Sequence, residues 1–187
     1  GRRRTRADLT TNAGPHSLCG TKWAKMFSIE RATVEDVDRV KQVLSETWVA
    51  TYADHLSRST IKQVTTQWHD PRLLRSQIEK PGDYFAVARD DGTIIGLITV
   101  VVSNRDELHL SRLYVRPAYQ GTGIGSRLLD AALASYPDAT VIRLEVEQRN
   151  AKGHAYWRNR KFVDIGTKLE QIGTDEIAMI TMERRLK

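Results

Sequence analysis

The sequence predicts one α/β domain of the α+β type, with a mixed but mostly antiparallel central sheet. Three observations support this fold class. Strand-like and helical segments follow one another in the order β-α-α-α-β-β-β-α-β-α-β-β after residue 26. Asp91-Gly92 separates two apolar segments, the strongest short-range signal for a β-hairpin. A glycine cluster at residues 121–125 follows a strand and opens an amphipathic helix.

The first part of the domain is predicted to be mainly helical. Residues 27–31 alternate between apolar and polar and indicate a short strand. Thr33 is a suitable N-cap because acidic residues follow it in the first turn. The helix after it carries apolar residues at helical spacing, namely Val37, Val40, Val43, Leu44 and Trp48. A second helix is predicted over residues 59–68 and a third after Pro71, since proline suits a first helical turn.

The remainder is predicted to supply most of the sheet. Residues 84–88 and 94–102 form the hairpin, and residues 107–115 form a further strand that ends before Pro117. The helix after the glycines has an apolar stripe of Ile124, Leu128, Leu129, Ala132, Leu133 and Tyr136. The order is completed by a strand over 141–146, a helix over 150–160 and strands over 162–169 and 176–182.

The positive charge of the chain is concentrated in one segment. The 187 residues carry 29 Lys and Arg against 23 Asp and Glu, a formal charge of +6. Residues 1–25 hold six of those basic side chains and one acid, Asp8, so the rest of the chain is nearly neutral. A folded face for nucleic acid is therefore not predicted. We expect residues 1–25 to be a basic extension outside the domain, which spans residues 26–187.

The composition also predicts the cellular compartment of the protein. Its single cysteine, Cys19, cannot form an intrachain disulfide, which fits a reducing compartment. The longest nearly apolar run, residues 94–102, is less than half of the roughly 20 residues that cross a bilayer. We expect a cytoplasmic protein that binds neither membrane nor nucleic acid, and a homodimer is compatible with the sequence. No metal site is expected, because His16, His55 and His69 lack ligand spacing.

The glycine cluster is the sharpest feature of the sequence. Backbone N–H groups in a first helical turn are unpaired, and the helix dipole makes that end positive, so the turn can hold a phosphate. A P-loop is excluded because Ser126-Arg127 stands where its Lys-Ser/Thr pair would be. A dinucleotide-binding turn remains a rival, with Ser126 at its third glycine position and Glu145 about 20 residues on. A tight strand-to-helix turn without a ligand is the plain alternative.

Two motifs together resemble one family. Gln120-x-x-Gly123-x-Gly125, after a strand ending Leu113-Tyr114-Val115-x-Pro117, resembles the acyl-CoA motif Q/R-x-x-G-x-G/A of the GNAT N-acyltransferases. Asn150-x-x-Gly153-x-x-Tyr156-Trp157-x-x-x-Lys161-Phe162 resembles that family's N-x-x-A-x-x-F-Y-x-x-x-G-F element. Thr47-Trp48-x-x-Thr51-Tyr52 is similar to the first helix of polyamine-acetyltransferase-like members. The resemblance covers roughly residues 27–186 and implies the GNAT fold, with six to seven strands flanked by helices on both faces.

The resemblance implies an N-acetyltransferase that uses acetyl-CoA as its cofactor and a primary amine as its acceptor. The strand from Leu113 to Val115 would pair with the pantetheine arm, and the Val115 N–H would polarise the thioester carbonyl. The loop amides would cradle the pyrophosphate of coenzyme A, and Asn150 would meet the cofactor from the next strand–helix turn. The expected cofactor-binding residues are Leu113, Tyr114, Val115, Gln120, Gly121, Thr122, Gly123, Ile124, Gly125, Ser126, Asn150 and Trp157.

The acceptor amine must lose a proton, since its conjugate acid has a pKa of roughly 10. The family often places a Glu or His for this task six residues before the valine of the cofactor strand, which gives His109 here. Strand alternation predicts that His109, Ser111, Leu113 and Val115 share one face. Glu107 is the reserve base, and a surface histidine without chemistry is the plain alternative. The predicted catalytic residues are therefore His109, Glu107 and Val115.

The sequence departs from the family pattern at two positions. Trp157 stands where members carry a tyrosine that protonates the departing thiolate, and the indole N–H is a very weak acid. Adjacent Tyr156 should face elsewhere, because one helical step turns the side chain by about 100°. We expect Trp157 to pack near the pantetheine sulfur instead. Lys161 replaces the usual glycine, so its turn must avoid positive φ or carry strain.

The acceptor side is predicted only in outline. Trp48 and Tyr52 lie where members shape the acceptor site, although core aromatics are the plain alternative. The acceptor could be a polyamine, another small amine or a protein amino group. A polyamine site should offer several carboxylates, and the available ones are Glu46, Asp54, Glu145 and Glu147. Because the tyrosine acid is missing, a coenzyme-binding regulatory pseudo-enzyme without turnover is the alternative function.

Overall fold

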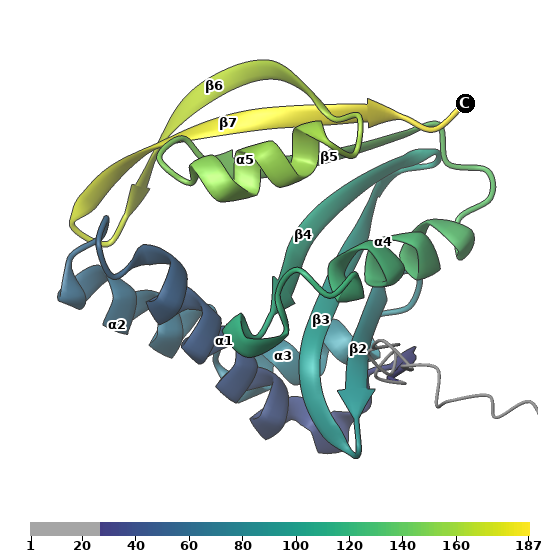
Figure 1. The fold of residues 1–187 in the computed structure, drawn as a ribbon, viewed down its shortest axis with the longest axis horizontal. Helices are drawn as coiled ribbons and strands as arrows, with labels where there is room; N and C mark the ends of the chain where they lie inside the picture. Colours follow the sequence, from purple (N-terminus) through teal and green to yellow (C-terminus); the bar gives the residue numbers. More distant parts are fainter. Residues whose placement is uncertain (1–26) are drawn as a thin grey trace, which may run out of the picture.

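The computed structural model describes residues 27–187, so the predicted basic extension lies outside the described residues. A seven-stranded sheet has the order β1-β2-β3-β4-β5-β7-β6 (Figure 1). Only the β4–β5 pair is parallel, and all other neighbours are antiparallel. The strands are β1 Ser28–Arg31, β2 Tyr84–Asp90, β3 Thr93–Asn104, β4 Glu107–Val115, β5 Val141–Glu147, β6 Val163–Ile172 and β7 Asp175–Arg185. The predicted fold class is confirmed.

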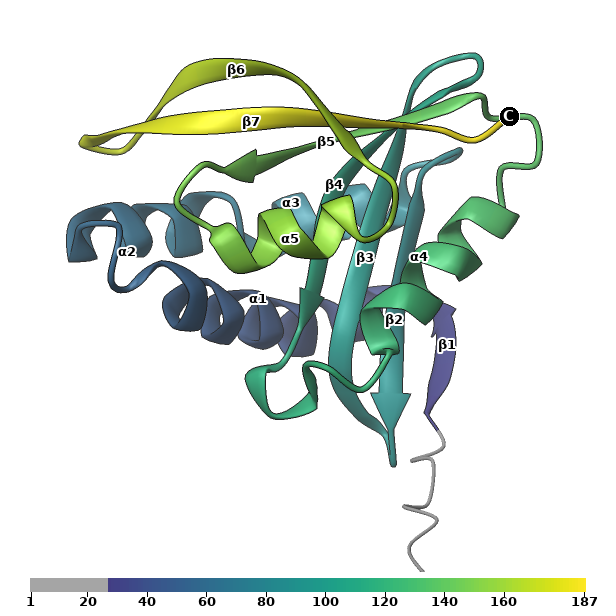
Figure 2. The same cartoon turned by 45° about the horizontal axis from the view of Figure 1, so that its top comes forward.

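Helices cover both faces of the sheet, as Figures 1 and 2 show. The apolar faces of α4 and α5 pack on one side, where Leu128 and Trp157 join the core with Leu144. On the other side, α1 and α3 bury Leu44 and Leu74 against β2 and β3. The helices are α1 Val37–Tyr52, α2 Arg58–Gln67, α3 Pro71–Glu79, α4 Ile124–Ala134 and α5 Ala151–Arg158, with single 3-10 turns over Val34–Asp36 and Pro117–Tyr119. No helix within residues 27–187 is both long and apolar enough to span a membrane.

The start of α1 is fixed by local chemistry and by the sheet. The Thr33 N–H donates to the Asp36 carboxylate at 3.0 Å, which closes a capping box at the N-cap that the sequence predicts. Arg89 on β2 approaches the same carboxylate to 2.6 Å. Burial alone would raise the pKa of Asp36, but the hydrogen bonds from Arg89 and Thr33 lower it below its usual value. Asp36 therefore stays ionised and ties the helix to the sheet.

The only parallel pair of strands separates along its length. Within the described sheet, β4 and β5 pair through three residues, ending with His109 opposite Arg143. Beyond that point β4 continues to Val115 and β5 to Glu147 without pairing with each other. The result is a V-shaped opening in the sheet, closed at His109 and widest at the carboxyl ends of both strands. Unpaired backbone groups along its edges are available to a ligand.

A β-bulge in β4 corrects one expectation. Leu110 lies opposite Val100, but Arg112 lies opposite Thr99, so Ser111 is the extra residue. The bulge reverses the alternation of side chains beyond it. Leu113 and Val115 pack with the α4 core, whereas Tyr114 packs with α1, and His109 lies opposite Val101 on the α1 face. The prediction that His109 shares a face with Leu113 and Val115 is therefore wrong.

Candidate active site

The glycine loop leads directly into the first turn of α4. Gly121 and Gly123 have φ of 78° and 88°, a left-handed conformation that favours glycine. A side chain added at either position would meet no atom within 4 Å, so the space in front of the loop is open. The first helical hydrogen bond runs from the Arg127 N–H to the Gly123 carbonyl, at 3.1 Å. The N–H groups before Arg127 are therefore available to an anion, as the sequence predicts for this loop.

The last glycine of the motif is explained by packing. A Cβ at Gly125 would lie 2.7 Å from the Tyr156 hydroxyl. Arg160 stacks on the Tyr156 ring at 3.5 Å and donates a hydrogen bond to the Ser126 hydroxyl. These contacts join the start of α4 to α5. Tyr156 thus serves the junction of two helices, and its ring is nearly perpendicular to that of Trp157, at 86°.

The β4 edge of the opening exposes backbone groups of alternate residues. The Arg116 N–H donates to the Ile95 carbonyl of β3 at 2.9 Å, so the backbones of Leu113 and Val115 point away from β3 and into the opening. The side chain of Gln120 donates to the Val115 carbonyl at 3.0 Å. Lys152 on α5 in turn donates to Gln120 at 2.7 Å. The predicted residue Gln120 therefore links the loop, β4 and α5.

Asn150 lies where β5 leads into α5. Its side-chain oxygen accepts from the Gly153 N–H at 2.8 Å and caps the helix. A Cβ at Gly153 would lie 2.7 Å from the Asn150 side chain, so the pair fixes a tight helix start. Burial raises the pKa of Tyr52, which the charges of Tyr114 and Glu147 raise further and a hydrogen bond with Asn150 partly offsets. Asn150 is thus also turned toward Tyr52, one of the two residues that the sequence predicts for the acceptor.

Trp157 is a core residue. It is 8% exposed, and its ring lies 5.2 Å from that of Phe162. The turn after this helix has the strain that the sequence predicted as one of two outcomes, because Lys161 adopts φ of 65°. A non-glycine residue in this region costs roughly 1–2 kcal/mol. The donor missing from position 157 is not supplied by the Tyr156 hydroxyl, which lies against Gly125.

The two predicted bases lie at the closed end of the V. Hydrogen bonds from Asn104, at 3.0 Å, and Arg143, at 2.9 Å, lower the pKa of Glu107 and hold its carboxylate. His109 lies opposite Arg143, and its side chain makes no hydrogen bond or ion pair within residues 27–187. Six residues of strand separate His109 from Val115, about 20 Å. The predicted catalytic residues are thus distributed along the whole strand.

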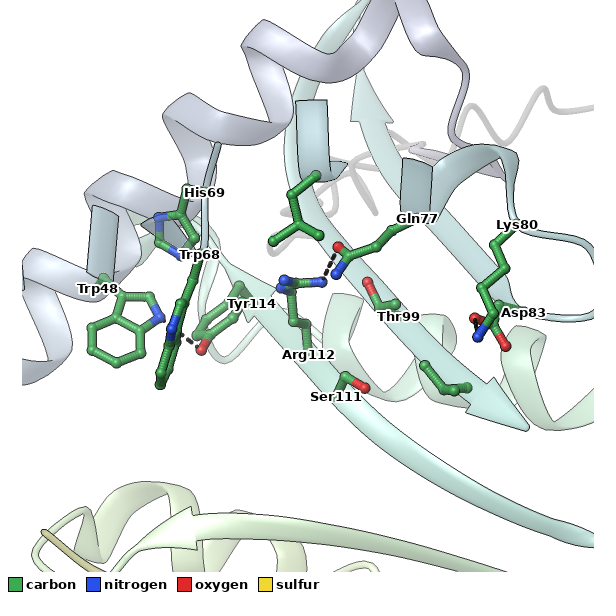
Figure 3. Close-up of a pocket in the computed structure, with 12 residues that line it drawn as sticks. Trp48, Trp68, His69, Gln77, Lys80, Asp83, Thr99, Ser111, Arg112 and Tyr114 are labelled. Carbon is green, nitrogen blue, oxygen red and sulfur yellow. Dashed lines mark hydrogen bonds and ion pairs between the residues drawn. The ribbon is translucent and has the colours of Figure 1, made fainter. Parts of the chain in front are cut away.

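The predicted acceptor residues form part of an aromatic cluster. The rings of Trp48 and Tyr52 lie 4.5 Å apart at the end of α1. The Trp48 indole donates to the Tyr114 hydroxyl at 3.0 Å, and the Trp68 ring stands edge-on to Trp48 at 5.9 Å. Tyr114 is expected from sequence on the cofactor strand, but its side chain turns toward Trp48 (Figure 3). We call Trp48, Tyr52, Trp68 and Tyr114 the aromatic cluster.

Glu147 is the functional candidate that sequence reasoning did not separate from other acids. It is 5% exposed at the end of β5 and lies opposite Met179 of β7. One carboxylate oxygen accepts from the Arg149 N–H at 3.1 Å, and the other has no partner among the described residues. Since Leu144 and Val146 face the α4 core, alternation turns Glu147 toward the aromatic cluster. A buried carboxylate with a free oxygen needs a donor.

The other three acids proposed for a polyamine site do not join Glu147. Arg116 holds Glu46 at 2.7 Å, and Lys168 holds Glu145 at 2.7 Å. Asp54 is exposed beyond the end of α1. Of these four acids, only Glu147 is buried, and the four do not converge.

Comparison with known proteins extends this description. Residues 52–186 match the family described as acetyltransferase (GNAT) domain. The uncharacterized N-acetyltransferase Rv2669 of Mycobacterium tuberculosis is 31% identical over 101 residues, which are 53% of this chain and 65% of that protein. The match thus spans just under two thirds of that relative's length. The spermidine N(1)-acetyltransferase of Thermoplasma acidophilum is 28% identical over 143 residues, or 73% of this chain and 88% of that protein.

A solved structure has the same architecture. The paia N-acetyltransferase from Thermoplasma acidophilum, crystallised in complex with coenzyme A, matches with a TM-score of 0.71 and 25% identity. The match covers 86% of this chain and 99% of that chain. The central sheet and the flanking helices described above are therefore shared with a protein that holds coenzyme A.

Proposed function

We propose, from the premise that the chain belongs to the GNAT acetyltransferase family, that it transfers an acetyl group from acetyl-CoA to a primary amine. Transfer would be direct, with both substrates bound together. The observation that carries the proposal is the opening between β4 and β5, which lies between the glycine loop and the aromatic cluster. One side of the opening suits phosphates and the other suits an amine.

The glycine loop fits the phosphates of coenzyme A. Open space lies in front of Gly121 and Gly123, and the N–H groups of the first turn of α4 face that space. The amides of residues 121–126 would hold the pyrophosphate, as the resemblance implied. Acetyl-CoA supplies the acetyl group as a thioester, which is reactive toward amines.

The backbone of β4 would position the thioester. The N–H groups of Leu113 and Val115 point into the opening and can donate to its carbonyl oxygen, where charge develops during transfer. Because Gln120 already occupies the Val115 carbonyl, the pantetheine arm would pair with the remaining groups or displace that side chain. Val115 stays the donor predicted from sequence, and Leu113 is its equivalent nearer the closed end.

Glu147 is the best placed proton acceptor. It lies beyond the last β4–β5 pair, as does Leu113, so the two residues line opposite edges of the opening. Its free oxygen can bind the ammonium form of the acceptor and then take the proton that the amine gives up. His109 lies about 13 Å from Leu113 along β4, toward the closed end of the opening. It is therefore too far away to take the proton directly from an amine beside Glu147. Glu107 is held by Arg143.

No protein acid is needed for the departing thiolate. Trp157 is buried and its indole cannot serve as an acid at neutral pH. A thiol has a pKa of about 8.5, so its anion leaves tolerably near pH 7. The replacement of tyrosine by Trp157 is thus compatible with turnover.

The aromatic cluster suits a cationic amine beside Glu147. Ring faces attract an ammonium group with about 0.5–2 kcal/mol, more where water is excluded. A small amine and a protein amino group both meet this description. A long polyamine fits less well, because Glu46 and Glu145 are already neutralised by Arg116 and Lys168.

The test is thiol release from acetyl-CoA with a panel of primary amines, together with mass spectrometry of the products. We expect release well above the rate of hydrolysis, with one acetyl group added to the amine. A protein that binds coenzyme A but releases no thiol above hydrolysis with any amine would support the alternative of a coenzyme-binding regulatory pseudo-enzyme.

A further inference from the structure

A cavity of about 360 Å³ adjoins the aromatic cluster on the α1 face of the sheet. Its walls come from β3, β4, α3 and the segment between α2 and α3 (Figure 3). The apolar walls include Trp68, Leu73 and Val101. Arg112, His69 and Thr99 line the same cavity, where His69 Nδ1 and the Thr99 hydroxyl have no hydrogen-bond partner among the described residues. None of these three polar residues is among the site residues that the sequence predicts, so their meeting in one cavity needs a separate explanation.

Arg112 is a partly buried cation without a counter-ion among residues 27–187. Its guanidinium donates to the Gln77 side chain at 2.8 Å, and no carboxylate within residues 27–187 pairs with it. Arg89 and Arg143, in contrast, each bridge two acids. Burial lowers the pKa of Arg112, which is the mark of a charge removed from water. Since a charge that is partly removed from water gains from a counter-ion, this one suits an anion.

Two neutral polar groups face the same space. His69 is 1% exposed with an unpartnered Nδ1, and Thr99 is 2% exposed with an unpartnered hydroxyl. Burial and the charges of Arg112 and Lys41 lower the pKa of His69 to about 4, so its ring is neutral near pH 7. A buried polar group that is left without a hydrogen bond is costly. A ligand that accepts a hydrogen bond from the Thr99 hydroxyl and pairs with His69 Nδ1 would satisfy both groups.

The cavity carries one positive charge that is free for a ligand. Lys80, the other cation in its walls, is paired with Asp83 at 2.9 Å. One guanidinium beside hydrogen-bonding groups matches a monoanion, and a carboxylate meets its planar fork with two parallel hydrogen bonds. A dianionic phosphate would leave one charge uncompensated.

We infer that this cavity binds a carboxylate carried by the acceptor, so that the substrates are amino acids whose amine lies several bonds from the carboxylate. The inference rests on the proposed function. Arg112 and Tyr114 are two residues apart on β4, about 7 Å, and Tyr114 reaches Trp48 in the aromatic cluster. A chain of about six carbons spans that distance, so a ligand with its carboxylate at Arg112 would carry its amine to the aromatic cluster, toward which Glu147 also turns.

The experiment compares acceptors of equal length that differ at one end. With acetyl-CoA, kcat/KM is measured for 6-aminohexanoate, hexylamine and 1,6-diaminohexane. We expect at least a tenfold preference for 6-aminohexanoate over both amines in the wild-type protein. Arg112→Gln should bring that preference close to one, and Arg112→Lys should keep part of it. Arg75→Gln, an exposed change on α3, should leave the preference as in the wild type.

Binding separates this inference from the proposed function. Calorimetry with 6-aminohexanoate, in the presence of coenzyme A, reports the cavity without turnover. Binding that is lost in Arg112→Gln, with no thiol release from any amine, would support the cavity and contradict the transferase. Acetylation of hexylamine as fast as 6-aminohexanoate by the wild-type protein would overturn the carboxylate site and leave the transferase intact. If Arg112→Gln does not fold, the wild-type preference and Arg112→Lys decide.

Discussion

Glu147 and Leu113 lie on opposite edges of the opening between β5 and β4. The last pair that joins the two parallel strands is His109 with Arg143. Leu113 follows His109 by four residues on β4, and Glu147 follows Arg143 by four residues on β5. A backbone donor on one edge therefore faces the region of a buried carboxylate with a free oxygen on the other. Acetyl transfer needs these two functions at one place, a donor for the carbonyl oxygen and an acceptor for the amine proton.

Gly123→Ala is expected to weaken acetyl-CoA binding by about tenfold or more, in addition to a loss of stability from its φ of 88°. The added methyl would enter the open space in front of α4. Gly82→Ala is the matched control, since Gly82 has φ of 86° and the same open surroundings but lies before β2. The melting temperature should fall by a similar amount in both variants, whereas calorimetry should find weakened coenzyme binding only in Gly123→Ala. Equal coenzyme affinity of the two variants would refute the phosphate role of the loop.

Trp157→Tyr is expected to leave kcat within about threefold of the wild type, although a general acid can contribute about 10²-fold or more. The reason is that Trp157 fills a buried position against Phe162 instead of presenting a proton donor. Steady-state kinetics with saturating acetyl-CoA measures this directly. A large gain in kcat from the tyrosine would contradict the packing role.

Mild acid is expected to destabilise the fold through His69. An unfolded histidine has a pKa of about 6.5, whereas burial, Arg112 and Lys41 lower that of His69 to about 4. Above pH 6.5 the ring is neutral in both states and contributes nothing. Between pH 6.5 and 4 the unfolded chain takes up a proton that the folded chain refuses, so the free energy of unfolding falls, by about 2 kcal/mol at pH 5.

Urea unfolding at pH 7.5 and pH 5 measures that loss. His69→Gln should remove most of the difference between the two pH values, because no group then titrates at this position. His55→Gln, an exposed change after α1, should behave as the wild type does. An unfolding free energy of the wild type that is equal at both pH values would rule out the buried neutral histidine.

Local signals in the sequence were enough for the fold and for the loop. Asp91-Gly92 marks a hairpin by its turn conformation, and Gly121 and Gly123 mark left-handed backbone before a helix. Thr33 with Asp36 marks a helix start. Each of these signals depends on residues close in sequence, so the sequence alone predicts them.

The acceptor side depends on contacts between distant segments and was harder to predict. The bulge at Ser111 has no local marker, yet it reverses every side chain after it in β4. Glu147 differs from Glu46 and Glu145 because it is buried and because Arg116 and Lys168 reach the other two. The free charge of Arg112 is likewise visible only once the absence of a nearby acid within the described residues is known.

The most direct measurement is kcat/KM for amine acetylation in Glu147→Gln and His109→Gln, with coenzyme binding measured alongside to show that each variant folds. Glu147→Gln keeps the shape of the side chain but cannot take a proton, so we expect a loss of about 10²–10⁴-fold with coenzyme affinity retained. His109→Gln should lose less than about threefold, because His109 lies at the closed end of the V. A full rate in Glu147→Gln with a loss in His109→Gln would contradict the assignment of the proton acceptor to the open end of the β4–β5 opening.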